Sequence, residues 1–214
     1  FYSKNETVLE NQYDSHIAIG SLPNYFRRTL KSFKKTATTY LKPNYNLAAE
    51  LRSDLLDKKT KFLCGLTWKG GSKIHNLASN KSISLGSLAK VLFRDSVKLV
   101  SLQYGNTEEE LKNLKRDTDI DIIQLSELDY FNDIDGLSAL IQACDKVVTI
   151  DNLVVHLAGA IGKDTNILLP YSCDWRWGNL DNRSYWHSSV TFLRQKHVCD
   201  WRVPLNLLGS DVMI

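Results

Sequence analysis

The sequence predicts an α/β fold, with a Rossmann-like parallel sheet of about six strands and helices on both faces. From Lys61 onward, short runs rich in Val, Ile and Leu alternate with segments of helical apolar spacing, and the runs recur about every 20 to 30 residues. The runs are apolar almost throughout, which is typical of strands buried on both faces of a parallel sheet. Both observations favour strands joined by helical crossovers.

Each element of this sheet can be placed along the chain. The apolar runs predict strands at residues 62–68, 97–103, 119–124, 146–151, 165–169 and 190–194. Helical spacing predicts helices near residues 84–94, 107–116, 134–144 and 153–162. The third helix has the clearest pattern, with Asp133 as a cap before apolar residues at positions i, i+3, i+4 and i+7.

Residues 149–170 contain a strand, a sharp turn, a helix start and a second strand. Asp151 or Asn152 is the expected N-cap, because its side-chain oxygen can accept a free backbone N–H. Residues 158–160 are small and should let the helix lie close to the sheet, and Gly162 suits a helix end that needs a positive φ. A helix that begins at the carboxyl end of a strand points free N–H groups at a bound anion.

Residues 1–60 differ from the rest of the chain. Asn, Lys, Ser, Thr and Tyr are frequent there, and Pro23 and Pro43 interrupt the segment. It contains ten Lys or Arg and six Asp or Glu. We expect a linker with one or two short helices, followed by a single domain over 61–214. Because the chain begins with Phe1 rather than Met, we expect it to be a processed product or a piece of a longer protein.

Composition excludes several classes of protein. The chain has 214 residues, 43% of them hydrophobic, yet no apolar run approaches the roughly 20 residues that cross a bilayer, so no transmembrane segment is expected. The four cysteines lie far apart without a CxxC pair, which predicts neither a zinc site nor a disulfide framework and favours a reducing cytoplasm. The basic residues between 27 and 35 are typical of a solvated helix face, so no nucleic-acid partner is expected.

Ligands of open α/β sheets bind at the carboxyl ends of the strands, where this sequence has several polar segments. These segments are residues 67–71, 103–105, 126–127, 151–156 and 170–178. Lys69, followed by Gly70 and Gly71, offers a cation beside a backbone that can approach a phosphate. The chain has neither a Walker A loop nor a GxGxxG motif, so a nicotinamide dehydrogenase is disfavoured.

His156 lies five residues beyond Asp151, in the first turns of the predicted helix. Two interpretations are open. The imidazole can be a packed side chain bonded to a carbonyl, with Asp151 a simple cap. Alternatively the aspartate, the helix N-terminus and the imidazole together form a clamp for a diphosphate.

Other chemistries fit less well. No GxSxG elbow is present for a nucleophilic serine. The acidic pairs in 119–122 and 133–136 have metal-ligand spacing but lie at strand or helix starts, where carboxylates favour capping, so no metal is expected. Residues 171–178 hold two tryptophans around Arg176 and should be ordered, in a pattern more typical of interdomain packing than of a sugar platform.

Several motifs together resemble one family. The runs DNLVVHLAGAIGKDTNILLPYSCDWRWG and SYWHSSVTFLRQ follow, in order, the upstream motifs SLP, GLTWKGG, NKSISL, VSLQYG and FNDIDGLSALI. They resemble the C-terminal region of bacterial tetratricopeptide-associated glycosyltransferases, which are similar to ADP-heptose heptosyltransferases and more distantly to O-GlcNAc transferases. The similarity extends over about residues 13–202.

The resemblance implies the C-terminal half of a GT-B fold, which holds the donor nucleotide and needs neither a metal nor another cofactor. Asp151 and His156 take the clamp positions, Thr67 and Lys69 fall in the phosphate-contacting loop after the first strand, and Gln103 lines the nucleotide pocket. The residues implied in binding the donor diphosphate or nucleotide are Thr67, Lys69, Gln103, Asp151, Asn152 and His156.

The resemblance also implies a substrate, a UDP-, ADP- or GDP-sugar, with a protein or glycan as acceptor. Asn152 and Leu153 replace the Thr-Gly pair that heptosyltransferases usually carry after the aspartate. The general base is expected in an N-terminal half, of which residues 1–60 match only the tail, so this chain alone is expected to be inactive. The alternatives are a non-catalytic α/β interaction domain derived from a glycosyltransferase and a flavodoxin-type sensor.

Overall fold

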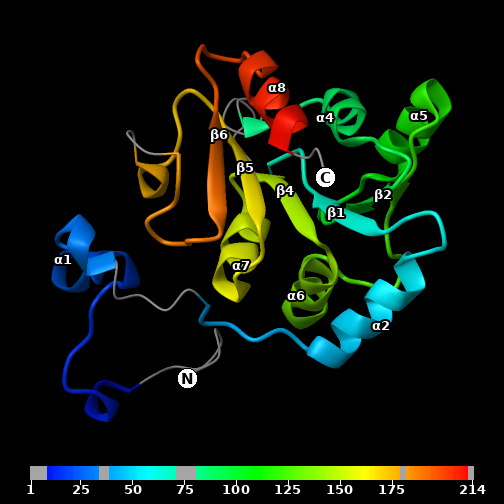
Figure 1. The fold of residues 1–214 in the computed structure, drawn as a ribbon. Coiled ribbons are helices and arrows are strands. Elements are labelled where there is room, and N and C mark those ends of the chain that lie inside the picture. The colour runs from blue at the N-terminus through cyan, green and yellow to red at the C-terminus, as the bar shows by residue number, and fades with distance from the viewer. Residues whose placement is uncertain (1–8, 34–38, 71–80, 179–181, 212–214) are drawn as a thin grey trace. The chain divides into compact units, whose positions relative to one another are not determined.

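The computed structural model describes residues 9–33, 39–70, 81–178 and 182–211 (Figure 1). Five residues named in the sequence analysis lie outside these ranges: Phe1, Lys34, Lys35, Gly71 and Asn80, the first residue of the NKSISL motif. The chain divides into two compact units, residues 1–36 and 37–214.

The first unit consists of short turns in its described part: η1 (Glu10–Gln12), η2 (Ile19–Ser21), α1 (Pro23–Phe26) and η3 (Leu30–Phe33). Pro23 starts α1, where its missing N–H costs nothing. No residue in η2, α1 or η3 is buried.

The second unit is built on one parallel sheet of six strands in the order β3-β2-β1-β4-β5-β6. The strands are β1 (Phe62–Leu66), β2 (Val97–Ser101), β3 (Ile122–Ile123), β4 (Lys146–Ile150), β5 (Thr165–Leu169) and β6 (Val190–Arg194). β4 and β5 are buried along their whole length. The predicted fold class is therefore confirmed.

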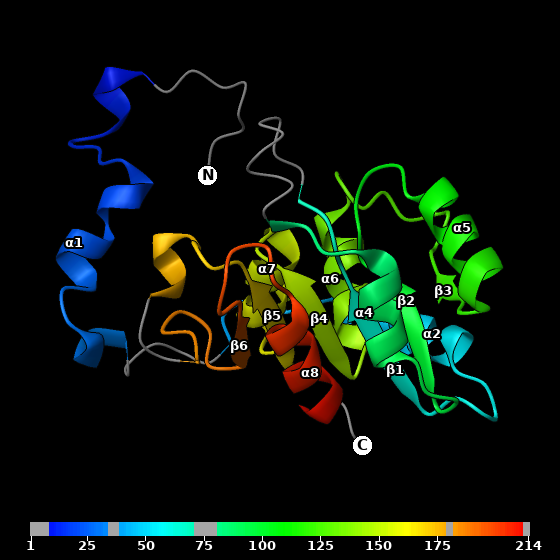
Figure 2. The same cartoon turned by 90° about the horizontal axis from the view of Figure 1, so that it is seen from above.

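Helices cover both faces of the sheet, as Figures 1 and 2 show. They are α2 (Tyr45–Leu55), α4 (Leu85–Leu92), α5 (Glu108–Thr118), α6 (Ile134–Ala143), α7 (Leu153–Ile161) and α8 (Arg202–Asp211). One core cluster joins the sheet to α4, α5 and α8, and another joins its opposite face to α2, α6 and α7. Each strand thus buries side chains in two directions, which explains the continuous apolar runs.

Two elements differ from what the sequence predicts. β3 contains only Ile122–Ile123, because Asp119 takes a left-handed conformation (φ 59°) as the C-cap of α5 and cannot begin a strand. Helix α8 was not predicted from the sequence, and its Leu208 is fully buried against the face covered by α4. Asp133 caps α6 as predicted, and its carboxylate accepts the N–H of Gly136 at 2.8 Å.

Helix α2 packs against α6 and lies within the second unit. Arg52 of α2 donates to the carbonyl of Ala143 at 2.7 Å and pairs with Asp145 at 3.0 Å. The sequence places this segment within the 1–60 linker, and its proposed role as the tail of a further domain stays a prediction.

Candidate functional site

The strand order reverses between β1 and β4, since β2 and β3 lie on one side of β1 while β4, β5 and β6 lie on the other. In open α/β sheets this switch point leaves a crevice at the carboxyl ends of the two strands, where ligands bind. Thr67 follows β1, and Asp151 and Asn152 follow β4. The structure therefore brings three of the sequence-predicted site residues to the switch point.

Hydrogen bonds between side chains connect the ends of β1 and β4 at the switch point. The hydroxyls of Thr67 and Thr149 lie 2.6 Å apart, and the Asn152 amide donates to the Thr67 hydroxyl at 2.8 Å. The bond between Asn152 and Thr67 links the end of β1 to the start of α7. Thr67 is fully buried. The hydroxyl is therefore not exposed to a ligand at the carboxyl edge of the sheet.

Asn152 is the N-cap of α7, which decides between the two residues that the sequence offered. Its side-chain oxygen accepts the N–H of Val154 at 2.9 Å. Leu153 occupies the first helical position and is 47% exposed. Gly162 ends the helix with φ 79°, as its position in the sequence predicts.

Asp151 pairs with Lys81, whose ammonium lies 2.5 Å from the carboxylate. The aspartate side chain is 9% exposed and the lysine side chain 32% exposed, so the cation faces solvent beside the start of α7. Lys81 was not predicted as a site residue, although it lies within the NKSISL motif. The local sequence does not indicate this pairing, because Lys81 lies 70 residues from Asp151.

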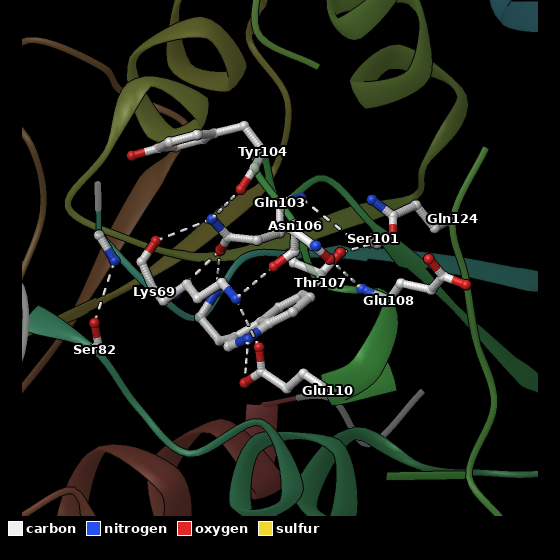
Figure 3. A network of polar contacts seen from close by, with 12 residues as sticks. Lys69, Ser82, Ser101, Gln103, Tyr104, Asn106, Thr107, Glu108, Glu110 and Gln124 are labelled. Carbon is white, nitrogen blue, oxygen red and sulfur yellow. Dashed lines mark hydrogen bonds and ion pairs between the residues drawn. The ribbon is translucent and has the colours of Figure 1, made fainter. Parts of the chain in front are cut away.

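Gln103 belongs to a second group of polar contacts, over the ends of β1 and β2 (Figure 3). Its side-chain oxygen accepts the backbone N–H groups of Trp68 and Lys69, each at 3.0 Å, and its amide donates to the carbonyls of Lys69 and Tyr104. Gln103 is 1% exposed. It therefore shapes the loop after β1 from below, with its polar atoms engaged by backbone.

Lys69 lies in the same network and is paired with Glu110 of α5 at 2.8 Å. Its ammonium also donates to the carbonyl of Asn106 at 3.2 Å, and the indole N–H of Trp68 donates to Glu110 at 2.8 Å (Figure 3). The N–H of Gly70 bonds the Ser82 hydroxyl at 3.2 Å. A phosphate would compete with Glu110 for Lys69.

His156 lies in an aromatic cluster on α7. Its ring stacks on Trp177 with centroids 5.2 Å apart and contacts His187 at 5.7 Å. Burial lowers the pKa of His156, which favours the neutral form of the imidazole. The small residue Gly159 makes room for His187, because a Cβ there would lie 2.4 Å from the imidazole Cγ.

A cleft of about 700 Å³ opens beyond the ends of β2 and β3. Its polar side chains include Glu108, Lys112, Gln124 and Ser126, and its apolar wall includes Tyr130 and Phe131. The Gln124 oxygen accepts from the Thr107 hydroxyl at 2.7 Å, which fixes the amide (Figure 3). The cleft combines an aromatic wall with oriented polar groups, as small-molecule sites do.

Two further findings concern metals and membranes. Within the described ranges, no three His, Cys, Asp or Glu side chains gather in a way that could hold a metal ion. None of the described helices is long and apolar enough to cross a bilayer.

Among proteins of known sequence, the chain is 29% identical over 181 residues to Protein FlbA of Caulobacter vibrioides. The match covers 84% of this chain but only 30% of FlbA, so the chain spans less than a third of that relative. No family model matches the sequence.

Among solved structures, the chain is similar to E. coli ADP-heptose lps heptosyltransferase II, with a TM-score of 0.56 and 15% identity, over 87% of this chain and 58% of that one. It is also similar to a glycosyl transferase of family 9 from Veillonella parvula, with a TM-score of 0.52 and 16% identity, over 75% of this chain and 44% of that one. The chain therefore shares the α/β fold of the matched parts of these two structures.

Proposed function

We propose that residues 37–214 bind the nucleoside diphosphate of a nucleotide-sugar donor, as the C-terminal half of a metal-independent GT-B glycosyltransferase. The observation that carries this proposal is the pairing of Lys81 with the nearly buried Asp151 at the switch point, beside the start of α7. The cation and the positive end of the helix dipole would both stabilise the diphosphate that leaves when a sugar is transferred. Asp151 would hold Lys81 in place and need not touch the phosphate.

The cleft beyond β2 and β3 supports the proposal by its position. Neighbouring strands lie about 4.8 Å apart, so β2 is about 10 Å from β4. This separation suits a diphosphate at α7 with its ribose and base reaching the cleft. UDP-, ADP- and GDP-sugars are the candidate donors.

The resemblance to tetratricopeptide-associated glycosyltransferases extends the proposal to parts of the protein beyond this domain. Transfer would require an N-terminal half that supplies the general base and binds a protein or glycan acceptor. Association with tetratricopeptide repeats, distant similarity to O-GlcNAc transferases and a cytoplasmic location belong to the same proposal.

Titration calorimetry of the 214-residue chain with UDP, ADP and GDP tests the site. We expect at least one nucleotide to bind, and Lys81→Met to weaken it by about tenfold, since a charge-assisted phosphate contact is lost. Both lysines are paired with a carboxylate, but Lys69→Met should have the smaller effect because Lys69 pairs with α5 and does not lie beside the start of α7. Lys90→Met, on the exposed side of α4, is the matched control.

A non-catalytic interaction domain is the second candidate. Leu153 exposes an aliphatic side chain where a bare backbone would suit a phosphate, and the Asn152 amide is already bonded to Thr67. If none of the three nucleotides binds at millimolar concentration to the wild type, this second candidate replaces the first.

A further inference from the structure

The 3-10 turn η4 (Trp175–Trp177) follows β5 and places its two tryptophans in opposite environments. Trp177 is 1% exposed, whereas Trp175 is 63% exposed. The turn lies beside β6, at the yellow-orange position of the chain in Figure 2. One indole anchors the turn and the other faces solvent.

The anchor is rigid. Trp177 stacks on His156 of α7 and meets the ring of Phe192 edge to face at 5.6 Å. Arg194 of β6 donates to the Trp177 carbonyl and to the sulfur of Cys173. These contacts fix η4 to α7 and β6 together.

The exposed indole is also held in place. The Arg176 guanidinium lies 5.0 Å from the Trp175 ring centroid, and Trp186 contacts the ring edge to face at 6.1 Å. The Asp174 carboxylate accepts from both the guanidinium (2.8 Å) and the backbone N–H (3.0 Å) of Arg176. Ordering an exposed aromatic side chain costs conformational entropy without the benefit of burial, which is the arrangement of a preorganised binding surface.

The turn that carries the exposed indole lies beside α7. Trp177 stacks on His156 in the first turns of α7, and the 3-10 rise of about 2 Å per residue keeps the backbone of Trp175 close to that of Trp177. Burial is the main cause that lowers the pKa of His156, and the charges of Asp151, Arg176 and Asp174 also act on it. Against the effect of burial, the pKa of Asp174 is lowered by its bonds to Arg176 and, to a smaller extent, by the charge of Lys81. The charges of the Lys81–Asp151 pair and those of η4 are therefore close enough to influence each other.

We propose that Trp175 and Arg176 form the platform that receives the sugar ring of the donor. This inference rests on the proposed function, since it places the sugar next to the diphosphate at α7. The C–H face of a pyranose can pack on the free part of the indole, while its hydroxyls bond the Asp174–Arg176 pair. The charged groups around the indole match a ring with one apolar face and polar edges better than they match an apolar protein surface.

Calorimetry with matched ligand pairs tests the platform: UDP against UDP-glucose, ADP against ADP-glucose and GDP against GDP-mannose, on the full chain. For at least one pair we expect the sugar to improve affinity about tenfold. Trp175→Ala should abolish this gain and leave the affinity for the nucleoside diphosphate unchanged, while Trp175→Phe should retain part of it. Phe93→Ala, an exposed aromatic at the opposite edge of the sheet, should keep the whole gain.

Two results overturn the inference alone: nucleotides that bind without any gain from the sugar, and a Trp175→Ala variant that weakens both members of a pair equally. If no nucleotide binds at all, the proposed function fails and the inference fails with it. Thermal melts of each variant confirm that the fold is retained.

Discussion

The polar side chains at the carboxyl edge differ mainly in their partners. The side chain of Gln103 is buried and bonds only backbone, and Lys69 pairs with Glu110 of α5. Lys81 keeps a partly exposed ammonium over the nearly buried Asp151. Residue type alone would rank Lys69 first, whereas position ranks Lys81 first, because both lysines are paired and similarly exposed but Lys81 lies beside the start of α7.

Replacement of Gln103 by Leu should destabilise the domain. The change leaves the N–H groups of Trp68 and Lys69 unpaired in a buried loop, and we expect a loss of about 2 to 4 kcal/mol in the free energy of unfolding. Urea denaturation measures it. Gln142→Leu, at a half-buried position in α6, is the control, and an equal loss in both variants would contradict the prediction.

His187 should make stability depend on pH. Burial, and then the charge of His156, lowers the pKa of His187 to about 4, whereas an unfolded histidine titrates near 6.5. The unfolded chain takes up this proton at a higher pH than the folded chain does. The contribution of His187 to the free energy of unfolding is therefore complete above pH ~6.5 and is lost as pH falls toward 4.

Denaturation midpoints measured between pH 7 and 4 check this dependence. The variant His187→Gln should be less stable at pH 7 and should lose less stability on acidification than the wild type. His197→Gln, at an exposed position, should keep the wild-type slope. An identical slope in His187→Gln and wild type would show that another group is responsible.

At the scale of elements, caps and small residues set where helices begin, end and pack. Asn152 and Gly162 delimit α7 much as the local sequence predicts. The small residues of α7 serve a second purpose that the sequence did not indicate, because Gly159 faces His187 rather than the sheet. The loop before β6 can therefore approach the helix closely.

Gly159→Ala should be destabilising although alanine favours helix. The new Cβ would lie 2.4 Å from His187 Cγ, and overpacking of this kind costs roughly 1 to 3 kcal/mol. Gly86→Ala in α4 is the matched control, since its nearest atoms would be 3.9 Å away. We expect that control to be neutral or stabilised by up to about 1 kcal/mol. Thermal unfolding of both variants compares them directly.

At the scale of the whole molecule, nearly all of the core belongs to residues 37–214. Among the residues that the structure describes, the core clusters draw only on the sheet, its helices and the segments between them. In the first unit, Ile19, Tyr25, Phe26 and Leu30 are each at least 60% exposed.

Removal of residues 1–36 should therefore leave the sheet domain folded. We expect a cooperative transition whose midpoint differs from that of the full chain by no more than about 2 °C, because the described part of the first unit buries little. Circular dichroism melts of both forms measure it. A broad transition, or a fall of about 8 °C or more, would mean that the first unit contributes to the fold.

The sequence by itself determined the elements that depend on local periodicity: six strands, four of the helices, the cap of α6 and the left-handed end of α7. Apolar spacing and capping act over a few residues, so a single chain reveals them. Only the tertiary structure decided which of the predicted side chains can contact a ligand. Lys81 meets Asp151 across 70 residues and Lys69 meets Glu110 across 41. Pairings of that range depend on how strands and helices are brought together, and no local pattern encodes them.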